Sequence, residues 1–204
     1  MDRHTKTTID TYNAIAKRYA AANNTSPFWK KEFSLFTRCL RGRTVLEIGC
    51  GGGRDAALFL KKKYRYLGID ASRGLLKVAK QKNPGGTFRQ MDLFRMTFPT
   101  GSFDGVWTMA TLLHVPKRRV AKVLRSVHGL LQPAGLLAVS VKEKKGVDEA
   151  FIEQDKYGGV GRFFAFFTKT EFTNVLHAVG FRIIKSWRKQ EDSNTWLSFV
   201  ARRD

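Results

Sequence analysis

The stretch that decides the fold is VLEIGCGGGRDA, residues 45–56, in which a short apolar run leads into four glycines within five positions. The apolar run indicates a buried strand, and the glycines indicate a turn, because residues without a Cβ adopt positive φ and let a ligand approach the backbone. The free N–H groups of a following helix would face that ligand. A dinucleotide fingerprint needs glycine at position 54, where this chain has Arg54, a cation better suited to an amino-acid carboxylate. We therefore expect an adenosine-containing ligand here.

Strand and helix patterns alternate on both sides of this stretch. The expected strands are 43–49, 64–70, 87–92, 102–110 and 135–142, and the expected helices are 7–22, 28–36, 54–63, 73–82 and 118–131. Ser72 stands where it would cap the helix 73–82. Strands that alternate with helices of this length predict an α/β fold with a mostly parallel sheet and helices on both faces.

The C-terminal part departs from that alternation. Thr168 and Glu171 have the spacing of a capping box and would open a helix over 171–181. Two strand patterns follow, 181–190 and 195–203, separated by the polar turn EDSN, and they predict an antiparallel hairpin. Residues 143–167 are left as a long loop, and long loops in compact domains are usually functional.

Length and composition favour a single domain. The 204 residues are 43% hydrophobic, and we expect one domain over 1–204, with a helical cover at 1–42 and a core at 43–204. No apolar run approaches the roughly 18 residues of a spanning helix, and the first residues lack the apolar segment of a secretory signal. Two cysteines and four scattered histidines give neither a disulfide framework nor a metal-ligand spacing. We expect a soluble, cytoplasmic protein without a metal or a membrane partner.

The net charge leaves two interpretations open. Lys and Arg number 37 against 17 Asp and Glu, a formal charge of +20, which favours polyanions such as nucleic acid. The alternative is a solvated basic coat, because the surplus is spread along the chain and no segment forms a basic arm.

Carboxylates stand at the ends of the second and third expected strands. Asp70 lies 21 residues after Gly49, where a carboxylate can accept hydrogen bonds from both hydroxyls of a ribose. Asp92 closes the next strand. A glycine turn alone is a weak signal, but together with these two carboxylates it favours a nucleoside cofactor over a merely structural turn.

The motifs VLEIGCGGG, LGID, FRQMD, FDGVWTMATLLHVP and LLQPAGLLAVSV, in this order and spacing, resemble those of class I S-adenosylmethionine-dependent methyltransferases. The resemblance covers residues 8–203 and is closest to small enzymes of the ubiquinone and tRNA-wobble types. It implies a Rossmann-like seven-stranded sheet of order 3-2-1-4-5-7-6 with the seventh strand antiparallel. It also implies S-adenosylmethionine as cofactor and S-adenosylhomocysteine as product.

The same resemblance assigns roles to individual residues. The residues implied to bind the cofactor are Tyr19, Glu47, Gly49, Cys50, Gly51, Asp70, Ala71, Asp92, Leu93, Thr108 and Met109. Arg54 departs from the family pattern, where many members have a smaller residue, and we interpret it as a further cofactor residue that clamps a carboxylate. Within this set, Glu47 to Gly51 would line the methionine end, Asp70 the ribose, and Asp92 and Leu93 the adenine. Thr108, Met109 and Ala110 would face the sulfonium, and Tyr12 and Tyr19 would close over the pocket.

Two residues near the fourth expected strand have competing interpretations. His114 is the candidate general base by position, with a pKa near neutrality, and it is otherwise a structural residue before Pro116. Trp107 offers a ring face to a sulfonium, but an inward core aromatic is the preferred interpretation. Methyl transfer needs no catalytic triad, because positioning and desolvation supply most of the acceleration.

The aromatic stretch GRFFAFF, residues 161–167, lies within the expected long loop. Its rings either stack on a flat substrate or pack a lid onto the core. The residues expected to form this lid and to touch substrate are Tyr12, Tyr157, Arg162, Phe163 and Phe164.

Three functions are compatible with these features. We expect a methyltransferase acting on a small molecule, with an RNA base of tRNA or rRNA as the alternative acceptor that the charge favours. A catalytically silent methyltransferase-like binding module is the rival from another class, and intact Glu47, Gly49, Gly51 and Asp70 argue against it. A nicotinamide oxidoreductase is disfavoured by Arg54. The acceptor atom and the oligomeric state cannot be predicted from the sequence.

Overall fold

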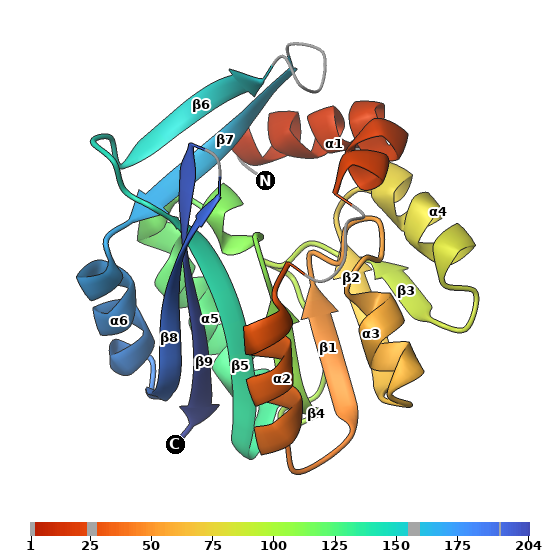
Figure 1. Ribbon diagram of the computed structural model, residues 1–204, viewed down its shortest axis with the longest axis vertical. Coiled ribbons are helices and arrows are strands. Elements are labelled where there is room, and N and C mark those ends of the chain that lie inside the picture. The colour runs from red at the N-terminus through yellow and green to blue at the C-terminus, as the bar shows by residue number, and fades with distance from the viewer. Residues whose placement is uncertain (1–2, 24–27, 155–159, 192) are drawn as a thin grey trace.

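The computed structural model describes residues 3–23, 28–154, 160–191 and 193–204, and its arrangement is drawn in Figure 1. The helices are α1 (Arg3–Ala22), α2 (Lys30–Cys39), α3 (Ala56–Lys61), α4 (Arg73–Lys82), the 3-10 turn η1 (Leu112–His114), α5 (Lys117–Leu130) and α6 (Lys169–Ala178). The strands are β1 (Thr44–Ile48), β2 (Arg65–Asp70), β3 (Thr87–Gln90), β4 (Phe103–Thr108), β5 (Leu131–Glu143), β6 (Glu149–Gln154), β7 (Val160–Phe167), β8 (Phe181–Glu191) and β9 (Asn194–Arg203).

The main sheet has the predicted order. Strands β3, β2, β1, β4 and β5 are parallel neighbours, β9 pairs with β5 in the antiparallel sense, and β8 pairs with β9. This gives the expected 3-2-1-4-5-7-6 sequence, with β9 as the antiparallel seventh strand. The α/β fold and the hairpin at the C-terminal end of the chain are therefore confirmed.

The expected loop at 143–167 is wrong, because most of it is strand. β6 and β7 form an antiparallel hairpin with Phe151 opposite Phe163, and β7 continues the sheet beside the end of β5. The alternating pattern of β7 explains its structure: Phe163, Ala165 and Phe167 pack into the core, which only a strand permits. A lid role for this hairpin stays a prediction.

Local capping follows the sequence as expected. The Ser72 side chain accepts the Leu75 N–H at 3.1 Å, and Thr168 and Glu171 form a complete capping box at the start of α6. These side chains satisfy N–H groups that the first turn of a helix leaves without partners. In the described residues no helix combines the length and apolarity needed to cross a membrane.

The two N-terminal helices contact different parts of the sheet. α1 lies across α4 and β7 at the carboxyl ends of the parallel strands, and α2 packs against β5 and β9 (Figure 1). Asn13 fixes α1 to α4, because its Oδ1 accepts the Ser72 hydroxyl at 2.8 Å and the Gly74 N–H at 3.0 Å. Just before Asn13, α1 is also bound to β7: Thr11 donates to the Gly161 carbonyl at 2.8 Å, and Thr8 accepts the Phe163 N–H at 3.0 Å. The helix therefore roofs the region where ligands bind in this class of sheet.

Candidate active site

The glycine turn after β1 has the backbone that its composition predicts. Gly49, Gly51 and Gly53 have φ of 72°, 53° and 78°, in the left-handed region that favours glycine. A Cβ on Gly49 would lie 2.2 Å from the Thr111 hydroxyl, whereas a Cβ on Gly51 would meet nothing within 4 Å. The absence of side chains in the turn thus has two effects: at Gly49 it lets Thr111 approach, and at Gly51 it leaves open space.

Asp70, at the end of β2, is held by this turn. One carboxylate oxygen accepts the Gly51 N–H at 2.9 Å, and the other accepts the Ser72 N–H at 2.8 Å. Burial raises the pKa of Asp70, and the two backbone donors counter that shift. Each oxygen keeps a second lone pair, so the carboxylate can still accept two hydrogen bonds from a ligand.

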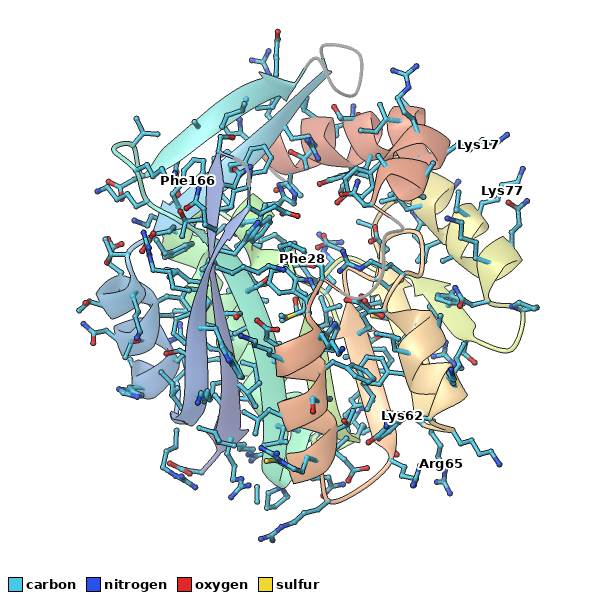
Figure 2. The ribbon with its side chains drawn as sticks, viewed as in Figure 1. Lys17, Phe28, Lys62, Arg65, Lys77 and Phe166 are labelled. Carbon is cyan, nitrogen blue, oxygen red and sulfur yellow. The ribbon has the colours of Figure 1, made fainter. Side chains whose placement is uncertain are left out.

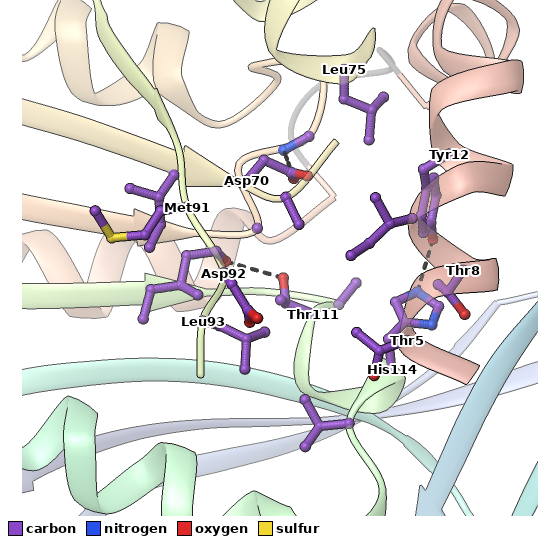
Figure 3. Close-up of a pocket in the computed structure, with 18 of the residues that line it drawn as sticks. Thr5, Thr8, Tyr12, Asp70, Leu75, Met91, Asp92, Leu93, Thr111 and His114 are labelled. Carbon is purple, nitrogen blue, oxygen red and sulfur yellow. Dashed lines mark hydrogen bonds between the residues drawn. The ribbon is translucent and has the colours of Figure 1, made fainter. Parts of the chain in front are cut away.

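Asp70 lines a cavity of about 120 Å³ at the carboxyl ends of β1, β2 and β4 (Figure 3). Figure 3 shows Asp70 and Asp92 on one side of it and the α1 residues Thr5, Thr8 and Tyr12 on the other. Apolar side chains fill much of the wall, and the Asp92 carboxylate accepts the Phe94 N–H at 2.9 Å. The predicted cofactor residues in this lining are Tyr19, Gly49, Gly51, Asp70, Ala71, Asp92 and Leu93.

A second cavity of about 80 Å³ continues from the first across the glycine turn. The two share Tyr19, Gly49, Gly51 and Ala110 in their linings. The remaining predicted residues that line it are Glu47, Cys50, Arg54 and Met109. The structure therefore brings together eleven of the twelve predicted cofactor residues around two adjoining spaces.

Charged groups distinguish this second cavity from the first. Glu47 accepts the Tyr66 hydroxyl at 2.5 Å, and its pKa is raised by burial and by the neighbouring Asp55. Arg54 makes a two-pronged pair with Asp55, through Nε at 2.7 Å and Nη2 at 3.0 Å. Asp55 also accepts the indole N–H of Trp107 at 2.9 Å. The cavity thus offers a carboxylate and a guanidinium, the groups that an amino-acid zwitterion would meet.

Comparison with known proteins agrees with this geometry. A family model described as a methyltransferase domain matches residues 46–139, which span the glycine turn, Asp70, Asp92, β4 and the first part of β5. This matched stretch, a little under half of the chain, is therefore similar to methyltransferase domains. A demethylmenaquinone methyltransferase of Desulfitobacterium hafniense is 27% identical over 142 residues, 63% of this chain and 55% of the relative. A trans-aconitate 2-methyltransferase of Rhodopseudomonas palustris is 31% identical over 103 residues, 50% of this chain and 39% of the relative.

Solved structures show the same fold for the methyltransferase domain. The 1,6-didemethyltoxoflavin-N1-methyltransferase of Burkholderia thailandensis, with bound S-adenosylhomocysteine, superposes with a TM-score of 0.76 at 21% identity, over 100% of this chain and 91% of that chain. The magnesium protoporphyrin IX methyltransferase of Synechocystis, with bound S-adenosylmethionine, superposes with a TM-score of 0.76 at 16% identity, over 100% of this chain and 99% of that chain. By contrast, the chain spans only about half or less of the length of the two sequence relatives named above.

His114 in the methyltransferase domain belongs to a hydrogen-bonded relay. Its Nδ1 lies 2.6 Å from the Phe163 carbonyl, which can only accept, so Nδ1 carries the proton. Nε2 therefore accepts the Tyr12 hydroxyl at 2.8 Å, and that hydroxyl oxygen accepts Arg162 Nη1 at 2.9 Å. Figure 3 shows the Tyr12–His114 bond at the wall of the first cavity.

The expectation of a near-neutral imidazole is wrong. Burial, together with the nearby positive charges of Arg162 and Lys142, lowers the pKa of His114 to about 3, despite the Phe163 carbonyl. The one lone pair that could take a proton is already bound to Tyr12. In this arrangement His114 orients Tyr12, and its use as a general base stays a prediction that requires the relay to open.

Some predicted residues lie outside the two cavities. Thr108 is fully buried and lines neither, because β4 turns its side chain into the core just before Met109. Trp107 is a core residue, as preferred, with its ring against Phe33, Phe36 and Phe59. Phe163 and Phe164 are buried, and Tyr157 lies outside the described residues.

Three polar side chains near the site were not singled out from the sequence. Thr111 donates to the Ile48 carbonyl at 3.1 Å and faces the glycine turn, and Ser140 accepts the Ala110 N–H at 2.8 Å. The third is Lys142, two residues beyond Ser140 on β5. Ser140 and Lys142 interrupt an apolar strand at alternate positions, so they share one face of the sheet, and this was a readable signal.

Proposed function

We propose that this chain binds S-adenosylmethionine across the two adjoining cavities and transfers its methyl group to a small-molecule acceptor. The observation that carries the proposal is Asp70, whose carboxylate is anchored by backbone N–H groups from the glycine turn and from the start of α4. That anchoring leaves acceptor positions toward the first cavity, as two vicinal ribose hydroxyls require.

The chemistry of the donor set fits the proposed ligand along its whole length. Asp92 and the apolar wall suit an adenine with its exocyclic amine, Asp70 suits the ribose, and Glu47 with Arg54 suits the amino-acid end. The open space beside Gly51, where these regions join, leaves room for the chain of the ligand. Arg54 has Nη1 outside its pair with Asp55, and we infer that this atom meets the ligand carboxylate.

When bound, S-adenosylmethionine supplies an electrophilic methyl group on a sulfonium, a good leaving group for in-line displacement. The chain then has to position the acceptor and exclude water. Tyr12 and Tyr19 pack edge to face, with ring centroids 5.0 Å apart, and roof the cavities from α1. Ser140 holds the Ala110 N–H at 2.8 Å and so supports the end of β4 beside the second cavity.

An RNA base is the second candidate acceptor, and the charge of +20 is the observation that favours it. We prefer a small molecule for two reasons. The relatives named above are methyltransferases of demethylmenaquinone and trans-aconitate, and the space next to the roofing tyrosines is bounded by buried side chains.

Titration calorimetry tests the cofactor assignment. S-adenosylhomocysteine should bind the full chain, and NADH should give no more heat than buffer. Tritiated methyl donor offered with tRNA, rRNA and a small-metabolite extract then tests the acceptor. Label confined to the RNA fractions would refute a small-molecule acceptor in favour of RNA. Cofactor binding without methyl transfer to any fraction would support a catalytically silent binding module instead.

A further inference from the structure

One lysine stands apart from the basic coat of this protein. The labelled Lys17, Lys62, Arg65 and Lys77 in Figure 2 project outward from the ribbon and are exposed. Lys142, near the end of β5, is only 7% exposed. A lysine is almost never buried without a partner, because removing an ammonium from water is costly unless an anion compensates it.

The neighbours of Lys142 are aromatic rings. Its Nζ lies 4.4 Å from the ring centroid of Phe164 and 5.7 Å from that of Trp196. Within the part of the chain that the structure describes, no carboxylate lies within ion-pair distance of it. The Glu191 carboxylate raises the pKa of Lys142 slightly against the effect of burial, and it accepts the Trp196 indole N–H at 3.2 Å.

A second buried cation adds to the positive potential at this point. Arg162, 3% exposed, lies with its guanidinium carbon 5.4 Å from the centroid of the same Phe164 ring. Burial and Arg162 together lower the pKa of Lys142 to about 8. The fold thus buries the Lys142 ammonium beside aromatic rings and near a second cation, and an anion that binds this ammonium would offset the cost.

The two cations lie next to the proposed site of methyl transfer. Arg162 is 5.1 Å from the ring centroid of Tyr12 and 5.8 Å from that of Tyr19, the residues that roof the cofactor cavities. Lys142 follows Ser140 by one strand repeat, about 7 Å, and Ser140 supports Ala110 at the second cavity. Lys142 lines neither cofactor cavity, but it is close enough to His114, at the wall of the first, to lower the pKa of that imidazole. It borders a separate cavity of about 190 Å³ beside the β8–β9 turn, where the carboxylate of Glu143 in β5 is paired with Arg188 at 2.8 Å.

We propose that the methyl acceptor carries an oxyanion, a carboxylate or a phosphate, that docks against the ammonium of Lys142 and is not itself the methylated group. Arg162 contributes to the field at this docking point while it positions Tyr12. This inference rests on the proposed methyltransferase function and names the substrate class of the same site.

The test uses the charge of the product, which needs no knowledge of the acceptor. The full chain is incubated with tritiated S-adenosylmethionine and the small-molecule fraction of a cell extract, and the labelled product is applied to an anion-exchange resin at pH 8. We expect the label to be retained. Treatment with phosphatase releases it if the oxyanion is a phosphate monoester and leaves it bound if it is a carboxylate.

Variants provide the second arm. Lys142→Met should lower label incorporation at least ten-fold while its affinity for S-adenosylhomocysteine stays within two-fold of the unmodified chain, which also shows that it is folded. Lys142→Arg should recover part of the loss, and the matched surface variant Lys77→Met should change neither quantity.

The remaining outcomes distinguish failure of the oxyanion proposal from failure of the methyltransferase proposal. A labelled product that passes through the resin, or full incorporation by Lys142→Met, refutes the oxyanion and leaves the methyltransferase proposal standing. No labelled product at all, although S-adenosylhomocysteine binds, refutes the small-molecule methyltransferase and this inference with it.

Discussion

The cofactor end and the acceptor end of the site are built in different ways. Most of the proposed cofactor end is formed by backbone groups and strand-end carboxylates between Glu47 and Asp92, with Tyr19 added from α1 and Met109 from the end of β4. The acceptor end is formed by side chains of α1, η1, β5 and β7, and its relay joins residues 102 and 150 positions apart. A ligand that stays the same across a family can be held by rigid local backbone, whereas we expect the acceptor to meet side chains that distant segments bring together.

Among the substitutions at the cofactor end, we expect the largest loss of ligand affinity at the anchored carboxylate of Asp70. Asp70→Ala removes the acceptor for the ribose and leaves the Gly51 and Ser72 N–H groups without their partner. We expect S-adenosylhomocysteine affinity to fall about 100-fold, or about 2.7 kcal/mol, because hydrogen bonds to charged groups contribute about 1.5–3 kcal/mol each. Titration calorimetry measures the loss.

Asp104→Ala is the matched control for that experiment. Asp104 also accepts a backbone N–H, from Thr44 at 2.8 Å, but at the start of β1, away from both cavities. Its removal should leave the affinity within two-fold. Equal losses in the two variants would mean that Asp70 serves the fold and not the ligand.

Alanine substitutions in the glycine turn compare a position where an added Cβ clashes with one where it only strains the backbone. Gly49→Ala places a Cβ 2.2 Å from the Thr111 hydroxyl at a φ of +72°, and should lower the free energy of unfolding by about 2 kcal/mol. Gly51→Ala has open space at a φ of +53° and should cost about 1 kcal/mol, mostly from strain. Urea denaturation measures both. A Gly51→Ala variant that loses as much stability as Gly49→Ala would contradict the open space.

The acceptor end is tested at its relay. Tyr12→Phe leaves Arg162 Nη1 and His114 Nε2 without the hydroxyl that joins them, and the free energy of unfolding should fall by about 1–2 kcal/mol. Tyr64→Phe is the matched control, because its hydroxyl makes one long bond of 3.5 Å, and should lie within about 0.5 kcal/mol of the unmodified chain. Thermal unfolding that shifts equally in both variants would contradict the relay.

The smallest expected effect is the change in the free energy of unfolding per pH unit. The pKa of His114 is about 3 in the folded chain and 6.5 without these surroundings, so the unfolded state binds more protons between these values. Stability from the neutral imidazole is complete above pH 6.5 and is lost as the pH falls, with a slope of up to about 1.4 kcal/mol per unit. The free energy of unfolding is measured by urea denaturation at several values between pH 6 and 4. In His114→Gln its change per pH unit should be smaller by that amount. An unchanged slope would show that the imidazole titrates normally.

Local patterns predicted the fold well where they were strong. Each strand and helix, the capping side chains of Ser72 and Thr168, and the two strands and turn of the C-terminal hairpin are encoded by residues close together in the sequence. The β6–β7 hairpin was missed because GRFFAFF has apolar residues at successive positions, so its period of two is hidden in the sequence. Only the packing of Phe163 and Phe167 into the core, with Phe164 and Phe166 on the other face, reveals a strand.

The site divides in the same manner. Asp70 and Asp92 could be located from sequence, because a parallel sheet places the ends of its strands at one edge. The state of His114 could not, since its low pKa depends first on burial and then on Arg162 and Lys142, cations 48 and 28 residues further along the chain. Long-range side-chain contacts leave no periodic trace, and Lys142 alone gave a sign of its position by interrupting an apolar strand.

The two threonine contacts between α1 and β7 have a further consequence. Thr8 and Thr11 fasten the first helix to a strand 150 and 155 residues away, and β7 pairs along its length with β6. The roof and the hairpin are therefore joined, so we expect a movement of α1 that admits the cofactor to disturb the wall near the acceptor as well. We expect the two ligands to bind interdependently, with the first to arrive setting the entrance for the second.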